Sequence, residues 1–145
     1  MQGDGRPVAV LAGASGFIGR HLGASFEADG YRVVRIGRRG PDARWGETER
    51  IRSLVDGAAV VVNLAGKSVN CRYTEANRRE VLRSRVETTR ELGEAIAGVD
   101  APPPVWLNAS TGTIYRDAHD RPMTEVDGEL GSGFSVDVAR HWEAA

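Results

Sequence analysis

Three glycines, each three residues from the next, limit what this chain can fold into more than any other feature. Gly13, Gly16 and Gly19 stand between a continuous apolar run at residues 8–12, typical of a buried strand, and residues 17–30, which have apolar side chains at helical spacing. In such a position the first glycine permits a tight turn, and the third allows the helix to pack closely on the sheet. The pattern therefore predicts an α/β sheet that begins with this turn.

The middle glycine of the set predicts a ligand. A residue without a Cβ lets a pyrophosphate approach the backbone, and the N–H groups at the start of the following helix favour an anion. The alternative is a tight turn to which nothing binds. We expect dinucleotide binding, with contacts from Gly13, Ser15, Gly16, Phe17, Ile18 and Gly19.

The rest of the chain continues the alternation of strands and helices. Crossovers of helical length between strands imply parallel pairing and right-handed connections. The expected fold is therefore a doubly wound, Rossmann-like α/β sheet with strand order 3-2-1-4-5. Further strands are expected at 31–36, 43–45, 58–64 and 105–109, helices at 48–55, 74–97 and 134–145, and a mostly irregular loop at 111–133.

Two features of the helices can be predicted in more detail. Ile18, Leu22 and Phe26 recur at intervals of four residues, so we expect them to pack the first helix on the sheet. Thr48 and Thr74 each precede an apolar periodic segment, which is typical of a residue that caps the start of a helix.

The composition is that of one globular domain. Apolar residues make up 41% of the 145 and charged residues 27%, with 19 basic side chains against 20 acidic ones. This balance argues against a nucleic-acid partner, and no spacing of His or Cys indicates a metal site. Apolar runs fall short of the roughly 20 residues that cross a bilayer, and residues 1–7 lack an export signal. We expect one cytoplasmic domain, residues 1–145, without membrane contact.

The residues after the second expected strand predict which cofactor is preferred. NAD-binding folds place an acidic residue there, which accepts hydrogen bonds from the ribose hydroxyls. This chain has Arg38 and Arg39 instead, and its first carboxylate, Asp42, lies beyond a Gly-Pro turn. A guanidinium matches a phosphate, and a charge-assisted hydrogen bond contributes about 1.5–3 kcal/mol. We therefore expect NADP(H) to be preferred by roughly 10- to 100-fold, the alternative being two solvated arginines.

Several motifs together resemble one family. VLAGASGFIG at 10–19, VVVNLAG at 60–66 and NASTGTIY at 108–115 are similar to the extended, epimerase/dehydratase-like branch of the short-chain dehydrogenase/reductases. SR at 84–85 and WE at 142–143 resemble its atypical subgroup, the epimerase family proteins, also described as cell-division-inhibitor-like. The resemblance covers essentially the whole chain. It implies a Rossmann domain that binds NADP(H) and belongs to an oxidoreductase or nucleotide-sugar epimerase.

The resemblance also implies which further residues contact the cofactor. Asn63, Leu64, Ala65 and Gly66 would line its adenosine side at the end of a central strand. Arg85 stands where typical extended members have an asparagine, and two interpretations stay open for it. It either reaches the cofactor phosphates or ribose, or is a surface arginine.

For catalysis, the resemblance implies Thr111, which takes the place of the family's catalytic serine or threonine that bonds the substrate oxygen. The family's acid/base is a tyrosine in Tyr-x-x-x-Lys, where lysine lowers a phenol pKa of about 10. Here the only lysine is Lys67, and Ser135 and Ala139 align with the two positions. Ordinary carbonyl reduction is therefore doubtful. Tyr115, Asp137 and His141 lie in the right part of the sequence to substitute, and Tyr115 is the candidate.

The sequence leaves two main functions open, besides a scaffold that has lost cofactor binding. The first is an NADP(H)-binding domain of an oxidoreductase or epimerase, and the second is a non-catalytic NADPH sensor that controls a partner. Relatives continue into a C-terminal substrate-binding region that is absent from these residues, so neither the substrate nor activity follows from the sequence. An uncovered sheet edge would favour self-association, for example as a homodimer.

Overall fold

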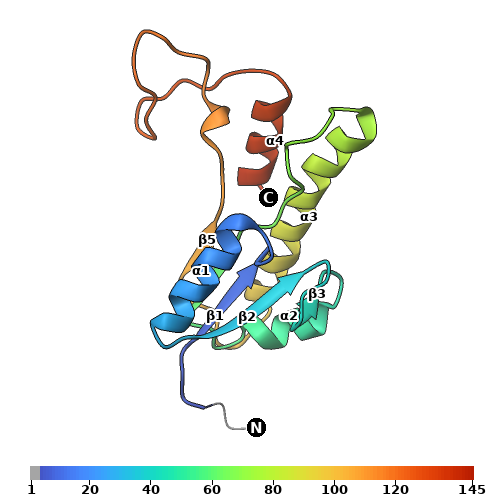
Figure 1. Cartoon of the computed structure of the whole chain (residues 1–145), viewed down its shortest axis with the longest axis vertical. Coiled ribbons are helices and arrows are strands. Elements are labelled where there is room, and N and C mark those ends of the chain that lie inside the picture. The colour runs from blue at the N-terminus through green and yellow to red at the C-terminus, as the bar shows by residue number, and fades with distance from the viewer. Residues whose placement is uncertain (1–3) are drawn as a thin grey trace.

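The computed structural model describes residues 4–145, and within them five parallel strands form one sheet in the order β3-β2-β1-β4-β5 (Figure 1). The doubly wound fold and its strand order are those expected from the sequence. In chain order the elements are β1 (Val8–Ala12), α1 (Phe17–Ala28), β2 (Arg32–Gly37), β3 (Ala43–Arg44), α2 (Thr48–Val55), β4 (Val60–Asn63), α3 (Glu75–Ala97), β5 (Trp106–Asn108), the short 3-10 helix η1 (Gly112–Ile114) and α4 (Phe134–Glu143).

The sheet lies between two layers of helices because successive side chains of each strand point to opposite faces. On one face, Val10 of β1 belongs to the main apolar cluster, together with Ile51 of α2 and Leu92 of α3. On the other face, Leu11 and its neighbours are covered by Leu22 of α1 and by the rest of that helix. This arrangement buries both faces of the central strands, as parallel sheets require.

The register of the strands brings their carboxyl ends to one edge of the sheet. Ala12 of β1 pairs with Ile36 of β2 on one side and with Asn63 of β4 on the other, and Asn63 pairs in turn with Asn108 of β5. The segments that follow these residues therefore meet at the same edge. Ligands of open α/β sheets bind there, outside the carboxyl ends of the strands.

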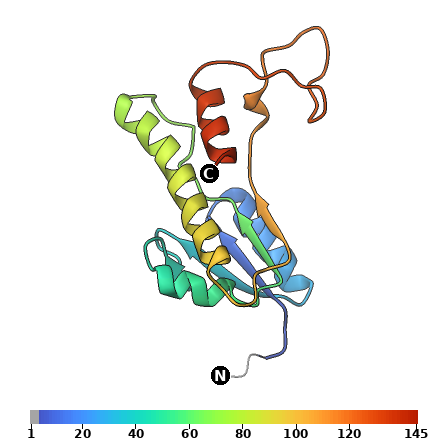
Figure 2. The ribbon, with the colours of Figure 1, turned by 180° about the vertical axis from the view of Figure 1, so that it is seen from behind.

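Beyond this edge lies the C-terminal part of the chain. Figures 1 and 2 show α4 beside the N-terminal half of α3, with η1 and a long loop next to it. Ile114 of η1 and Val136 and Ala139 of α4 form a small apolar cluster of their own. Strand β5 borders the sheet, and its Trp106 and Leu107 are exposed.

Two local predictions were wrong, and a third was confirmed. Leu22 and Phe26 pack against the cluster around Leu11 as expected, but Ile18 is 61% exposed and outside that cluster, because it stands in the first turn of α1, at the carboxyl edge of the sheet. Thr48 is the first residue of α2 rather than its cap; Glu47 takes that place without a capping side-chain bond. Thr74 does cap α3, and its hydroxyl accepts a hydrogen bond from the Asn77 N–H at 3.2 Å.

Among residues 4–145, no helix combines the length and the apolar character that crossing a membrane requires.

Candidate functional site

Two of the three glycines are required by the protein's own packing. Gly13 has a φ of +77°, and a Cβ there would lie 2.7 Å from the carbonyl carbon of Leu64. Gly19, inside α1, allows the helix to approach the preceding turn, since a Cβ would lie 2.6 Å from the Cα of Ala14. Both separations are too short for any side chain. The tight turn and the close packing of α1 therefore depend on these positions.

Gly16 is different, because neither backbone strain nor a close contact among the described residues requires glycine there. Its φ of −73° and ψ of 176° are extended values that any residue adopts, and a Cβ would meet only the Gly13 carbonyl oxygen, at 3.5 Å. It is the N-cap of α1, where no side chain accepts a hydrogen bond from the first turn and no acidic residue is present. The first N–H groups of the helix are thus available to an anion that approaches the exposed Gly16.

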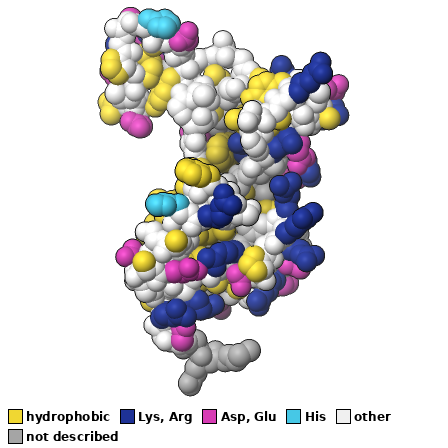
Figure 3. Space-filling model, viewed as in Figure 1, with side chains coloured by type: hydrophobic (Ala, Val, Ile, Leu, Met, Phe, Trp, Pro, Cys, Tyr) yellow, Lys and Arg dark blue, Asp and Glu magenta, His cyan; other side chains and the backbone are white. Residues whose placement is uncertain are grey.

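Four arginines line a cavity of about 780 Å³ beside this turn. We call it the arginine cavity; no acidic side chain lines it. Its remaining walls come from the glycine-rich turn and from the segment after β2. The lining residues are Ala14, Ser15, Arg20, Arg35, Ile36, Gly37, Arg38, Arg39, Gly40 and Pro41. In Figure 3 basic side chains lie over the half of the molecule that contains α1 and the sheet and also along α3, with acidic side chains among them.

The nearest carboxylates do not neutralise this cavity. Asp42 points back into the β2 turn, where its Oδ2 accepts a hydrogen bond from the backbone N–H of Arg35 at 2.8 Å. Glu27 is paired with the Arg35 guanidinium at 2.6 Å. In the described part of the chain, the guanidinium groups of Arg20, Arg38 and Arg39 have no carboxylate within ion-pair distance. The cavity therefore presents three positive charges to solvent.

Asn63, at the end of β4, is completely buried, and its amide is satisfied inside the protein. Its Nδ2 donates to the Thr89 hydroxyl at 3.0 Å and to Asn108 Oδ1 at 2.6 Å, while its Oδ1 accepts from the Ala65 N–H at 3.0 Å. The side chain therefore joins β4 to β5 and α3 and fixes the turn that follows β4. A cofactor contact at Asn63 would have to use its backbone.

The rest of the segment after β4 lies between the glycine turn and Arg85. Leu64 contacts Gly13 and packs in the apolar cluster below α1, Ala65 is buried, and Gly66 is exposed. A Cβ at Gly66 would lie 3.0 Å from the Arg85 guanidinium carbon, so this arginine covers the segment closely. Arg85 itself is half-buried and donates to the carbonyl oxygens of Lys67 and Val81 at 3.0 and 3.1 Å. Burial lowers the pKa of its guanidinium.

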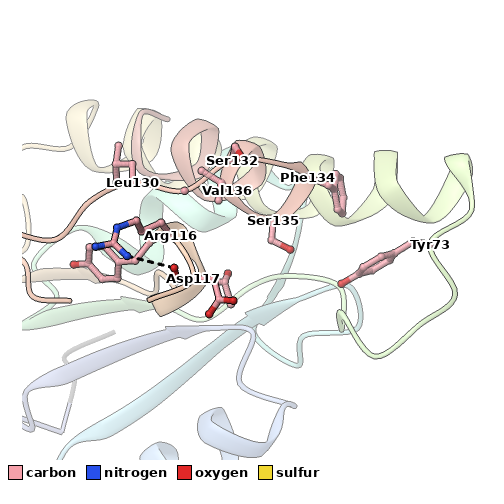
Figure 4. A pocket seen from close by; sticks show the side chains of 11 residues that line it. Tyr73, Arg116, Asp117, Leu130, Ser132, Phe134, Ser135 and Val136 are labelled. Carbon is pink, nitrogen blue, oxygen red and sulfur yellow. Dashed lines mark hydrogen bonds between the residues drawn. The ribbon is translucent and has the colours of Figure 1, made fainter. Parts of the chain in front are cut away.

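A second cavity, of about 560 Å³, lies farther from the sheet. We call it the loop cavity. Figure 4 shows Tyr73 and Ser135 toward one end of it and Arg116 and Leu130 toward the other. Tyr73 and Phe134 meet edge to face with ring centroids 5.4 Å apart, which joins the segment before α3 to α4. The cavity is lined by Tyr73, Thr113, Tyr115, Arg116, Asp117, Leu130, Gly131, Ser132, Phe134, Ser135 and Val136.

The two candidate catalytic residues lie on different sides of η1. The Thr111 hydroxyl accepts a hydrogen bond from the Thr113 N–H at 3.2 Å and thereby caps η1. Tyr115 lines the loop cavity, half-buried, and pairs through its backbone with Leu130. Ala139 of α4 is fully buried in the apolar cluster that this helix forms with η1. These geometries leave both catalytic assignments as predictions.

The structure thus brings most of the expected cofactor residues to one edge of the sheet. The glycine turn, Arg38 and Arg39 surround the arginine cavity, and residues 63–66 adjoin the turn. Phe17 and Ile18 directly follow the glycine turn, with 86% and 61% of their surface exposed. Sequence reasoning missed Arg20 and Arg35. The signal for Arg20 was present, since it stands one helical turn after Gly16.

Comparisons with known proteins identify the family of this chain. The model of the "NAD dependent epimerase/dehydratase family" matches residues 9–133. An epimerase family protein of Mycobacterium leprae is 32% identical over 151 aligned positions, which cover 99% of this chain and 48% of that protein. The crystal structure of human epimerase family protein SDR39U1 with NADPH superposes with a TM-score of 0.82 at 31% identity, covering 94% of this chain and 48% of that one.

A third relative is MoeE5, solved in complex with UDP-glucose and NAD. It superposes with a TM-score of 0.72 at 28% identity, over 94% of this chain and 46% of the other. The present chain therefore spans about half the length of these relatives. Since the family model matches residues 9–133 of 145, this chain belongs to the NAD dependent epimerase/dehydratase family.

Proposed function

We propose that this chain is the NADP(H)-binding domain of an epimerase-like oxidoreductase. The observation that carries the proposal is Gly16. Neither its backbone angles nor its neighbours require glycine, yet it stands exposed at the uncapped start of α1. The missing Cβ leaves room for a diphosphate against the first N–H groups of the helix.

The arginine cavity supports NADP(H) rather than NAD(H). The 2′-phosphate carries up to two negative charges near neutral pH, and Arg38 and Arg39 stand where NAD-binding folds have an acid. Asp42 does not replace that acid, because its carboxylate is turned back to Arg35. The relative human SDR39U1 was crystallised with NADPH, in agreement with this preference.

For the reaction, the proposal assigns Thr111 and Tyr115 to the substrate side. NADP(H) supplies hydride transfer when bound. The Thr111 hydroxyl would donate to a substrate oxygen, and Tyr115 would exchange a proton from the wall of the loop cavity. Neither has a lysine partner, so proton transfer would depend on Tyr115 without the usual cation. The substrate class and the activity of the whole protein belong to this proposal as well.

Calorimetric titration of the purified chain with NADPH tests the cofactor assignment. We expect the wild type to bind, and Gly16→Ala to lose affinity by about 10-fold or more with an unchanged melting temperature. Gly112→Ala is the matched control, because Gly112 also has open space around it but lies in η1. Equal NADPH affinity in wild type and Gly16→Ala would contradict the proposal.

A non-catalytic NADPH sensor is the alternative function. It is favoured by the residues at the two positions of the family's Tyr-x-x-x-Lys pair, since Ser135 and the fully buried Ala139 cannot perform that acid/base chemistry. Measuring oxidation of NADPH with carbonyl compounds and nucleotide sugars separates the two. Turnover supports the enzyme, whereas NADPH-dependent partner binding without turnover supports the sensor.

A further inference from the structure

Three arginines from two different elements face the same cavity. Arg38 and Arg39 come from the segment after β2, whereas Arg20 comes from α1, where its backbone N–H donates to the Gly16 carbonyl at 3.0 Å. This bond places Arg20 one turn along the helix from the glycine that the diphosphate would approach. One wall of the arginine cavity is therefore the same helical turn that offers its N–H groups to the pyrophosphate.

The fourth arginine of the cavity is already occupied. The Arg35 guanidinium is held at 2.6 Å by Glu27, and about a third of its side chain is exposed. A guanidinium held by a carboxylate has much of its charge compensated locally, so it attracts a further anion less strongly. Arg20 has no such partner among the described residues and remains free to bind.

Like charges gathered around one cavity repel each other unless an anion lies among them. The 2′-phosphate carries up to two negative charges and three oxygens, which suits more than two guanidinium donors. Arg38 and Arg39 occupy only the β2 side. The α1 side is open to a contact from Arg20.

We propose that Arg20 is a third residue of the 2′-phosphate site and contributes to discrimination between NADP(H) and NAD(H). This inference rests on the proposed function. The preference is then shared between the segment after β2 and the first turn of α1. Arg20 acts by donating hydrogen bonds to the phosphate oxygens, so its effect is confined to ligands that carry a 2′-phosphate.

Calorimetry on Arg20→Ala tests the assignment with four probes, namely NADPH, NADH, adenosine 2′,5′-bisphosphate and AMP. We expect the affinities for NADPH and for the bisphosphate to fall about 10-fold, and those for NADH and AMP to change less than about twofold. Arg90→Ala is the matched control. It removes the same charge, but Arg90 is exposed on α3 and lies outside the cavity. It should leave all four affinities within about twofold of the wild type.

The outcomes separate this inference from the proposed function. If wild type prefers NADPH and Arg20→Ala keeps the whole preference, the role of Arg20 is overturned while the cofactor site stands. Equal weakening of NADPH and NADH would place Arg20 on the part that both nucleotides share, which also overturns it. Failure of the wild type to bind either nucleotide overturns the proposed function and the role of Arg20 with it. Circular dichroism of each variant establishes that it is folded.

Discussion

The guanidinium of Arg85 lies over the indole ring of Trp142, 5.1 Å from the ring centroid. Arg85 belongs to α3 and Trp142 to α4, and the same guanidinium donates to the carbonyl oxygen of Lys67 in the segment after β4. One side chain thus joins the sheet edge, α3 and the C-terminal helix. Among the described residues, no other cation lies over the Trp142 ring. We infer that Arg85 positions α4 relative to the candidate cofactor segment.

Arg85→Ala is therefore expected to destabilise the protein. The cation–π contact contributes about 0.5–2 kcal/mol and each charge-assisted hydrogen bond about 1.5–3 kcal/mol, and part of this is offset by removing a half-buried charge. We expect a loss of about 2 kcal/mol in the free energy of unfolding, measured by urea titration with tryptophan fluorescence. Arg90→Ala, on the same helix but exposed, should cost less than about 0.5 kcal/mol.

A parallel NADPH titration of Arg85→Ala distinguishes the two interpretations of this residue. Lost affinity in a protein that is still folded would indicate that Arg85 also reaches the cofactor. Unchanged affinity with lower stability would assign it to positioning alone. A variant as stable as the wild type would contradict the positioning role.

The glycines of the turn should separate into two classes on substitution. Gly13→Ala forces a side chain into a left-handed conformation and against the Leu64 carbonyl, and Gly19→Ala drives a methyl group into the Ala14 backbone. Each is expected to cost about 2–4 kcal/mol of stability. Thermal unfolding checks this, with Gly16→Ala as the comparison that should melt like the wild type. Equal melting temperatures in all three variants would contradict this division.

Much of the fold could be predicted because its signals are local. The turn at Gly13, the apolar runs of the central strands and the caps of long helices all follow from neighbouring residues. Ile18 could not be placed correctly, because helical spacing says which side chains share a face but not where the sheet beneath them ends. Thr48 was expected to cap α2 because it precedes an apolar periodic segment, but the cap position is one residue earlier, at Glu47.

The residues of the candidate site that directly follow a strand could be predicted. Contacts between residues of different elements were harder to predict. Arg38 and Arg39 follow β2 directly, so their place was visible. The spacing of Arg20 from Gly16 places it near the glycine turn, but its approach to Arg38 and Arg39 depends on how α1 is rotated over β2. The internal bonds of Asn63 could not be foreseen either, since they depend on the register that sets it beside Asn108.

Substitution of Asn63 should show how far this buried amide holds the sheet edge together. Asn63→Leu removes three hydrogen bonds and leaves the Ala65 N–H, the Thr89 hydroxyl and the side-chain Oδ1 of Asn108 without this partner. The Ala65 N–H and the Thr89 hydroxyl belong to buried residues, whereas Asn108 is exposed and its oxygen can bind water. Buried polar groups left unpaired cost about 1–3 kcal/mol each, so we expect a loss of at least about 2 kcal/mol, measured by thermal and urea unfolding. The double variant Asn63→Leu with Thr89→Val removes the buried hydroxyl that Asn63→Leu leaves unpaired, so it should recover part of the loss. No recovery would argue against direct coupling.

The loop between η1 and α4 should lose its order in acid. The Arg116 guanidinium bonds both Asp120 and Glu129, which lowers the pKa of Asp120 to about 2 and that of Glu129 below its usual value. Carboxylates with lowered pKa values stabilise the folded loop above their unfolded pKa values, and this contribution disappears as the pH falls through the folded ones. The loop should therefore be ordered at neutral pH and loosen between about pH 4.5 and 2.

Amide hydrogen exchange across this range measures the effect at the Arg116 N–H, which donates to the Glu129 carbonyl at 2.8 Å. Its protection should fall in acid before that of amides in the middle of α3. Glu129→Gln removes one of the two carboxylates and should reduce protection at Arg116 already at pH 7, because the guanidinium then keeps only Asp120. Glu75→Gln, which breaks an exposed pair on α3, is the control and should leave it unchanged. If protection of the Arg116 N–H does not depend on pH in either the wild type or Glu129→Gln, the ion pairs do not order the loop.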